Sequence, residues 1–266
     1  MQPESQGLCF KGESLLQLGR VRNFKGLGYV CFLDILGFSQ DILANWNAVE
    51  SNPLEKLLAI KDALPVLCEE DEELPQESSV RSYVCRVNTV SDSITIAFGL
   101  EPKLVIGDMA LGLEAMVANI REVWRAAIER GYTLRGAIDF GDIYWDKNEL
   151  IGPAFINAYR LESEVARVSR VVISSKLNKV LANLSTLYPG DMIDHLVANF
   201  RKDIDGYVVV DPYKLGRTDE ERCLLVSSLQ RMASAASSPL LKEKYAPLIS
   251  MLSESASIDH NQLGAY

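Results

Sequence analysis

The sequence has few of the residues that build metal centres from sulfur and imidazole ligands. Of its 266 residues five are cysteine and two are histidine, and no CxxC pair occurs. His195 and His260 are far apart in the chain, so a zinc site is not expected. The sequence also offers no convincing Ser–His or Cys–His arrangement, which argues against catalysis by a protein nucleophile.

Positive charge and long apolar runs are scarce as well. The chain has 27 Lys and Arg residues against 36 Asp and Glu, a formal net charge of −9 at pH 7. This balance argues against a broad nucleic-acid surface, which needs clustered cations. No apolar run reaches membrane-spanning length and the first residues do not resemble a signal peptide, so we expect no membrane association and a cytoplasmic location.

Apolar residues are plentiful, at 48% of the chain, which allows a sizeable core. The pattern that organises the chain is an apolar run at Tyr29–Leu33, expected to be a buried strand, which leads into Asp34. A glycine turn and a helix that starts near Ser39 follow. An aspartate at a strand end is usually a turn or cap residue. Here it can also hold a cation while backbone N–H groups face phosphates.

A second aspartate, Asp92, lies in a polar turn between apolar runs at 80–90 and 93–99, which predict a β-hairpin. Strand, helix, hairpin, helix, strand is the ferredoxin-like order of an α+β fold. In that order the end of the first strand and the hairpin turn share one sheet edge, where neighbouring strands are about 4.8 Å apart. We therefore expect Asp34 and Asp92 to share Mg²⁺ or Mn²⁺, which prefer oxygen ligands.

The rest of the chain alternates helical and strand patterns. Helices are predicted at 39–47, 54–68, 106–130, 152–169, 175–187 and 217–255, the last with a break at 237–239; strands are predicted at 134–140, 143–145, 171–174 and 207–210. The acidic run at 69–79 is expected to be a solvated loop. We divide the chain into an N-terminal arm (1–27), a core (28–187) and a mainly helical C-terminal extension (188–266) packed on that core.

Four segments resemble motifs of the class III nucleotidyl cyclases. The segment FLDILGFS resembles the family motif FxDIxGFT, and the segment NTVSDSITIAF resembles the family's metal-binding hairpin. The segment LRGAIDFGDIY resembles the LRxGIHxGxV strand, and the segment GPAFINAYRLESE resembles the GxxVNxASRLES helix. Their order and spacing match over residues 28–175. The motifs are most similar to those of the bacterial pyrimidine (uridylate and cytidylate) cyclases of the Pycsar antiphage system.

The resemblance implies a catalytic core with two divalent ions per site and assigns a role to each matching position. The implied assignments are metal binding by Asp34, Asp92 and the Ile35 carbonyl, phosphate binding by Leu36, Gly37, Phe38, Ser39 and Arg135, and catalysis by Arg160 with Asn157. It also implies a homodimer in which the base-reading residues and the arginine come from the partner subunit.

The assignments of Asn157 and Arg160 each have an alternative. The family asparagine lies four residues before the arginine, where this chain has Ile156, and Asn157 is one residue late, about 100° around the helix. Either the helix begins differently or Asn157 has lost the ribose-orienting role. The alternative for Arg160 is a surface arginine paired with Glu164.

The base-reading positions depart from the adenylate cyclase pattern. Where adenylate cyclases have a lysine and a paired Asp or Thr, this chain has Asn88 and Glu149. A neutral amide offers both a donor and an acceptor, which suits the edge of a pyrimidine. We therefore expect conversion of UTP to 3′,5′-cyclic UMP, a second messenger in antiphage defence by the resemblance. The alternatives are CTP as substrate and a non-catalytic nucleotide-binding module.

Overall fold

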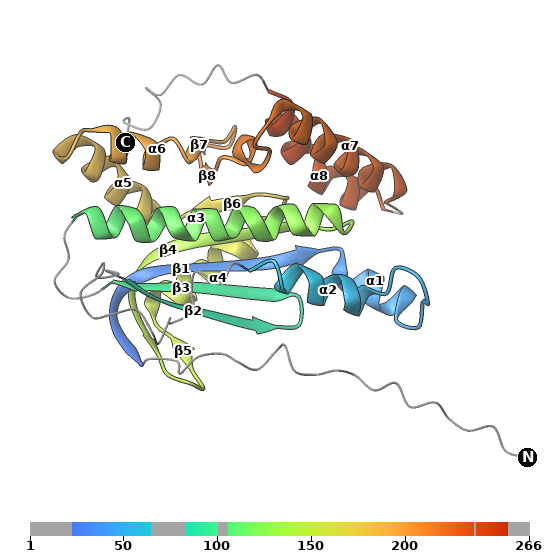
Figure 1. Ribbon diagram of the computed structural model, residues 1–266, viewed down its shortest axis with the longest axis horizontal. Helices are drawn as coiled ribbons and strands as arrows, with labels where there is room; N and C mark the ends of the chain where they lie inside the picture. Colours follow the sequence, from blue (N-terminus) through green and yellow to red (C-terminus); the bar gives the residue numbers. More distant parts are fainter. Residues whose placement is uncertain (1–22, 65–82, 101–105, 237, 255–266) are drawn as a thin grey trace, which may run out of the picture.

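The computed structural model describes residues 23–64, 83–100, 106–236 and 238–254. They form a mixed β-sheet with helices on both faces (Figure 1). The predicted α+β class is confirmed. Residues 1–22 of the predicted arm and the acidic loop at 69–79 lie outside the described ranges.

The strands form one sheet in the order β2-β3-β1-β4-β6-β8-β7, with β5 paired to β4. Their bounds are β1 Phe24–Leu36, β2 Tyr83–Val90, β3 Ser93–Leu100, β4 Thr133–Trp145, β5 Leu150–Ile151, β6 Val171–Ile173, β7 Phe200–Lys202 and β8 Val208–Val210. β1 lies between β3 and β4 and is antiparallel to both, while β2 and β3 form a hairpin. The first four strands therefore have the predicted ferredoxin-like order.

Helices cover both faces of this sheet and extend beyond it. They are α1 Phe38–Asn45, α2 Pro53–Lys61, α3 Ile106–Glu129, α4 Pro153–Glu164, α5 Ser175–Leu187, α6 Asp191–Val197, α7 Asp219–Ala235 and α8 Pro239–Ser253, with a 3₁₀ helix η2 at Pro212–Leu215. α3 packs on one face and α4 on the other. The C-terminal elements lie on the far side of α3 from the first four strands (Figure 1) and add their apolar residues to the main core.

The alternation of side chains along β1 fixes which face carries the site. Tyr29, Leu33 and Ile35 are buried in the core that contains α3, whereas Val30 packs with α4. Because successive strand residues point to opposite faces, Asp34 has the same orientation as Val30. Asp34 therefore lies on the α4 face, at the end of β1 marked by its arrowhead in Figure 1.

One predicted break does not exist. The sequence predicts separate strands at 134–140 and 143–145, but β4 runs without interruption through Gly141 and Asp142. Gly141 is paired with Gly28 of β1, and pairing continues on both sides of it. The long partner strand thus overrides the turn preference of the glycine.

Other element bounds also differ from the prediction. β1 begins at Phe24, inside the range assigned to the arm, and the three-residue strand β7 was not predicted. α2 ends at Lys61, and α4 ends at Glu164 rather than at 169. After α4 the N–H groups of Val165 and Ala166 both donate to the Leu161 carbonyl, which closes the helix. The chain then turns to dock against α8.

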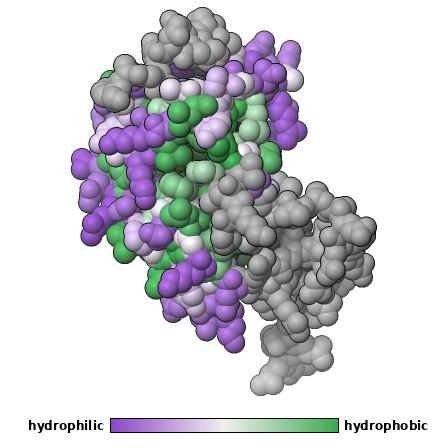
Figure 2. All heavy atoms as spheres, turned by 90° about the vertical axis from the view of Figure 1, so that its left-hand side faces the viewer, coloured by the Kyte–Doolittle hydropathy of each residue, from purple (hydrophilic) through white to green (hydrophobic). Residues whose placement is uncertain are grey.

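The two ends of the sheet differ in what they present. The arrowhead of β1, α1 and α2 lie toward the right of Figure 1, whereas Figure 2 views the left-hand end, where hydrophilic side chains flank a central apolar band. None of the helices in the described ranges is both long and apolar enough to cross a membrane.

Candidate metal and nucleotide site

Asp34 and Asp92 lie at the same end of the sheet, where β1 ends and β3 begins, as the sequence predicts. Asp34 is paired with Ser93, the first residue of β3, and Asp92 is in the turn just before it. The Ile35 N–H donates to the Asp92 carbonyl at 3.2 Å, and Ser39 Oγ donates to Asp92 Oδ2 at 3.4 Å. Hydrogen bonds from both sides therefore fix the hairpin turn against the end of β1.

The electrostatics of this edge favour a cation. Burial raises the pKa of Asp34, Arg135 lowers it, and the charge of Asp92 raises it again. A divalent ion between the two carboxylates would offset the effect of the Asp92 charge on Asp34. Within the described residues no group of three or more His, Cys, Asp or Glu side chains is arranged for a metal. Two carboxylates and one carbonyl still fit Mg²⁺ or Mn²⁺, which commonly take substrate phosphates as further ligands.

The turn from β1 into α1 has a backbone conformation that allows an anion to approach its N–H groups closely. Gly37 has φ 87°, the left-handed region that glycine adopts without strain. α1 begins at the next residue, and the first N–H groups of a helix have no intrahelical partner. Phe38 is buried and packs edge-on against Tyr132, which fixes the turn. The predicted phosphate loop thus presents a helix N-terminus beside the two aspartates.

Arg135 is held between two carboxylates. It is paired with Asp34 across β1 and β4, and its Nε lies 2.9 Å from Asp34 Oδ2 and 2.9 Å from Glu162 Oε1. Glu162 is only 3% exposed, and burial raises its pKa. The predicted phosphate-binding arginine is therefore at the site, but it contacts one of the predicted metal ligands.

Asn157 and Arg160 come from α4. Asn157 Nδ2 donates to Oδ2 of the buried Asp139 on β4 at 3.1 Å, whereas Ile156 is 49% exposed. The Asn157 amide therefore contacts the sheet, even though Asn157 comes one residue after the position of the family asparagine. Arg160 is exposed, and no ion pair joins it to Glu164 in the described structure.

Neither candidate base-reading residue makes a hydrogen bond or ion pair with Asp34 or Asp92 in the described structure. Asn88 is on the edge strand β2 opposite Thr95, two strands from Asp34 in the sheet order. Glu149 is in the turn between β4 and β5, where its N–H donates to Asp146 Oδ1. Arg86 Nη2 donates to the Lys147 carbonyl at 3.4 Å and so links β2 to that turn. The contact joins Arg86, two residues from Asn88, to the turn that contains Glu149. The base-reading role of Asn88 and Glu149 stays a prediction.

Three charged residues of the site were missed by the sequence analysis. Glu162 falls on the buried stripe of α4 with Ala154 and Ala158, a spacing of four that could have identified it. Lys61 interacts electrostatically with Asp92, and Lys244 with Asp34. No sequence signal marks these lysines, because their positions depend on how α2 and α8 pack.

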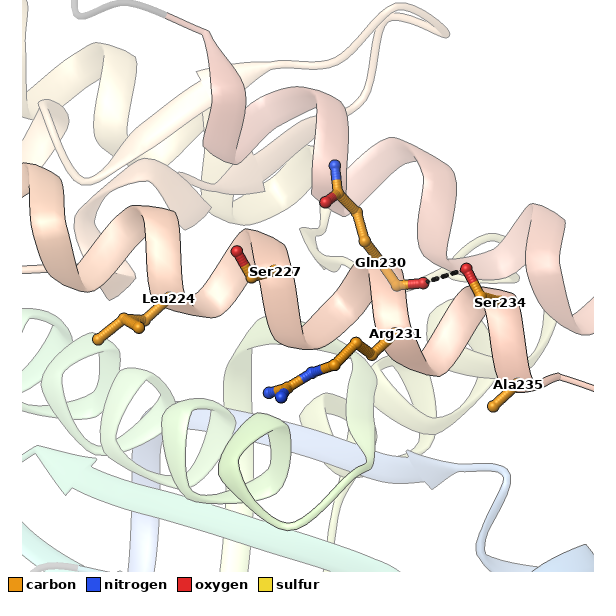
Figure 3. Close-up of a pocket in the computed structure, with 6 residues that line it drawn as sticks. All are labelled: Leu224, Ser227, Gln230, Arg231, Ser234 and Ala235. Carbon is orange, nitrogen blue, oxygen red and sulfur yellow. Dashed lines mark hydrogen bonds between the residues drawn. The ribbon is translucent and has the colours of Figure 1, made fainter.

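A separate shallow hollow lies along the surface of α7 (Figure 3). Its lining residues are Leu224, Ser227, Gln230, Arg231, Ser234 and Ala235. All six come from one helix, and Ser234 Oγ donates to the Gln230 carbonyl of the same helix. None of the predicted site residues contributes to it.

Comparisons with known proteins give similarities of fold. No protein-family model and no curated protein matches the chain. Among solved structures, a class III adenylyl cyclase-like ATP-binding protein from Pseudomonas aeruginosa is 16% identical, with a TM-score of 0.43 over 61% of this chain and 37% of that one. The guanylyl cyclase Cya2 is 15% identical, with a TM-score of 0.42 over 71% and 92% of the two chains.

A bacterial light-regulated adenylyl cyclase is 12% identical, with a TM-score of 0.39 over 60% of this chain and 46% of that one. The chain thus spans less than half the length of two of these three proteins.

Proposed function

We propose that this protein is a pyrimidine nucleotide cyclase that converts UTP to 3′,5′-cyclic UMP and pyrophosphate. The observation that carries the proposal is the meeting of Asp34 and Asp92, from distant segments, at one sheet edge beside a helix N-terminus. The four motifs described above supply the family context. The product would act as a second messenger in antiphage defence, as the Pycsar resemblance implies.

Two Mg²⁺ or Mn²⁺ ions would be held by the side chains of Asp34 and Asp92 and by the Ile35 carbonyl. When bound, such ions acidify an attacking hydroxyl and neutralise phosphate charge. The donor set consists of oxygen atoms only, which matches these ions.

The residues of the chain bind and orient the substrate. N–H groups of Leu36–Ser39 bind the phosphates together with Arg135, Asn157 orients the ribose, and Arg160 stabilises charge on the α-phosphate. The ribose 3′-oxygen forms a bond to the α-phosphorus, the bond to the pyrophosphate oxygen breaks, and the hydroxyl proton passes to solvent. Both reacting groups belong to one molecule, so positioning and charge stabilisation are sufficient without a protein nucleophile.

We further propose a homodimer whose sites are shared between subunits. Arg160 is exposed on α4 in the single chain, and its neighbours Ile156 and Tyr159 are 49% and 51% exposed. Large apolar side chains gathered at a surface are typical of contact sites. Arg160, Asn88 and Glu149 would then serve the site of the partner subunit, which accords with the separation of Asn88 from Asp34 along the sheet.

Two alternatives remain for the same site. The base of CTP presents to an asparagine amide a hydrogen-bonding edge similar to that of UTP. A non-catalytic nucleotide-binding module is favoured by one observation, the engagement of Asp34 by Arg135 at 2.9 Å.

The test is incubation of the purified protein with ATP, GTP, CTP and UTP separately, with Mn²⁺, followed by product identification by mass spectrometry. We expect cyclic UMP and pyrophosphate in equal amounts, and no product from Asp34→Ala. Absence of cyclic product from every nucleotide would reject the enzyme, and product from ATP alone would reject the base assignment. Activity that survives Asp34→Ala would reject the metal assignment.

A further inference from the structure

The C-terminal helix α8 is tied to the strand that carries Arg135. The Ser169 N–H donates to the Lys244 carbonyl at 3.0 Å, and Ser169 Oγ donates to the Leu134 carbonyl at 3.1 Å. Leu134 is in turn paired with Ile35 of β1. The backbone of Lys244 is therefore fixed beside the strand ends that form the site.

The next residue of α8 meets the predicted phosphate loop. Tyr245 is 4% exposed and belongs to the main core. Its hydroxyl oxygen lies 3.9 Å from the point that a Cβ on Gly37 would occupy. Leu248 and Leu252, one and two turns further on, are also buried. Packing along this stripe holds the first half of α8 against the turn from β1 into α1.

Lys244 brings an unpaired cation to this edge. Its side chain is half-buried on α8, between the backbone contact with Ser169 and the approach of Tyr245 to Gly37, and its charge interacts with that of Asp34. Among the described residues no hydrogen bond or ion pair engages the Lys244 ammonium, whereas Arg135 has both Asp34 and Glu162. A half-buried lysine that makes no hydrogen bond or ion pair among the described residues, close to a helix N-terminus, is suited to an anionic ligand.

We propose that Lys244 is a further phosphate-binding residue of this site, supplied by the C-terminal extension. Its ligand class is the pyrophosphate portion of a magnesium-bound nucleoside triphosphate, which becomes the leaving group. The proposal rests on the proposed function, since it assigns a ligand group to the same site. It gives α8 a role in binding as well as in packing.

The test uses the full chain and magnesium pyrophosphate as the probe, with affinity measured by isothermal titration calorimetry. We expect Lys244→Gln to weaken binding about 10-fold, as loss of one charge-assisted contact predicts. Lys244→Arg, which keeps the charge, should retain most of the affinity. Lys242→Gln is the matched control, because Lys242 is exposed on the same helix, and it should bind like the wild type.

Equal affinity of Lys244→Gln and wild type would overturn the proposal and leave the proposed function intact. A wild type that binds neither pyrophosphate nor UTP would contradict both. Thermal unfolding of each variant checks that α8 stays docked. If Lys244→Gln is destabilised, Lys244→Met, which keeps the apolar stem, gives the same comparison, and unchanged affinity in that variant overturns the proposal.

Discussion

Arg135 Nε and Asp34 Oδ2 lie 2.9 Å apart across β4 and β1, and the same nitrogen lies 2.9 Å from Glu162 Oε1. One guanidinium is thus shared between an aspartate at the sheet edge and a buried glutamate from α4. A divalent ion bound to Asp34, as proposed, would compete with Arg135 for the same carboxylate. Glu162 gives Arg135 an alternative partner, so the arginine need not remain on Asp34 when the ion binds.

Removal of Glu162 should therefore weaken metal binding. In Glu162→Gln the arginine keeps, of its two charged partners among the described residues, Asp34 alone. We expect Mn²⁺ affinity to fall about 3- to 10-fold. Electron paramagnetic resonance of free Mn²⁺ during titration measures this directly. Glu164→Gln is the control, because Glu164 is exposed on the same helix. Unchanged or tighter binding in Glu162→Gln would contradict the competition.

Asp34→Asn should stabilise the metal-free protein. Burial raises the folded-state pKa of Asp34, so its charged form is disfavoured by folding at neutral pH. That penalty disappears as pH falls through the raised pKa, and the neutral amide removes it at all pH values. We expect the melting temperature to rise by about 2–4 °C, which corresponds to about 1 kcal/mol at this chain length.

The control for this experiment is Asp142→Asn, since Asp142 is an exposed aspartate of β4. A lower melting temperature for Asp34→Asn would show that the ion pair with Arg135 outweighs burial.

Metal affinity should depend on pH through the ionisation of the Asp34 carboxyl group. A carboxylate must be ionised to bind Mn²⁺ or Mg²⁺, and the raised pKa of Asp34 moves its protonation to higher pH than the ordinary value of 3.8. We expect affinity to decline on acidification before an ordinary aspartate would be protonated. Calorimetric titrations of Mn²⁺ across a pH series measure the profile. A midpoint at or below the ordinary value would contradict this prediction.

The sequence predicts the sheet edge well because its signals are local. The apolar run before Asp34, the glycine at position 37 and the polar turn around Asp92 each specify a strand end or a turn without reference to the rest of the chain. The ferredoxin-like order then follows from the element sequence alone. The continuity of β4 does not, because Gly141 resembles a turn residue until its pairing with β1 is known.

The charges around the aspartates are less predictable. Lys244 is more than 200 residues from Asp34, and only the docking of α8 brings their charges together. The ion pair between Arg135 and Glu162 likewise depends on how α4 lies on the sheet. Residues that reach a site from a distant segment leave no periodic pattern in a single sequence.

Base selectivity should depend on Asn88. Asn88→Leu removes both the donor and the acceptor while keeping a similar volume, and we expect kcat/KM for UTP to fall about 10- to 100-fold. Turnover of each nucleotide under competition, read by mass spectrometry, measures the preference. Val90→Ala is the control, because Val90 is exposed on the same strand. Unchanged selectivity in Asn88→Leu would remove Asn88 from base recognition.

A mixed dimer tests whether two subunits share each site. Asp34→Asn and Arg160→Ala should each be inactive alone. If the aspartate and the arginine of one site come from different subunits, half of the randomly mixed dimers are heterodimers with one intact site. Activity should then recover to about a quarter of wild type. No recovery after verified subunit exchange would place both residues of a site on one chain.

The central position of β1 has a consequence for biosynthesis. β1 is among the first strands to leave the ribosome, yet its partner β4 begins only at Thr133, about 100 residues later. During synthesis one edge of this apolar strand therefore stays unpaired until β4 has emerged, and unpaired strand edges promote self-association. Nascent chains arrested before Thr133 should need a chaperone to stay dispersed, whereas chains extended past Trp145 should need it less.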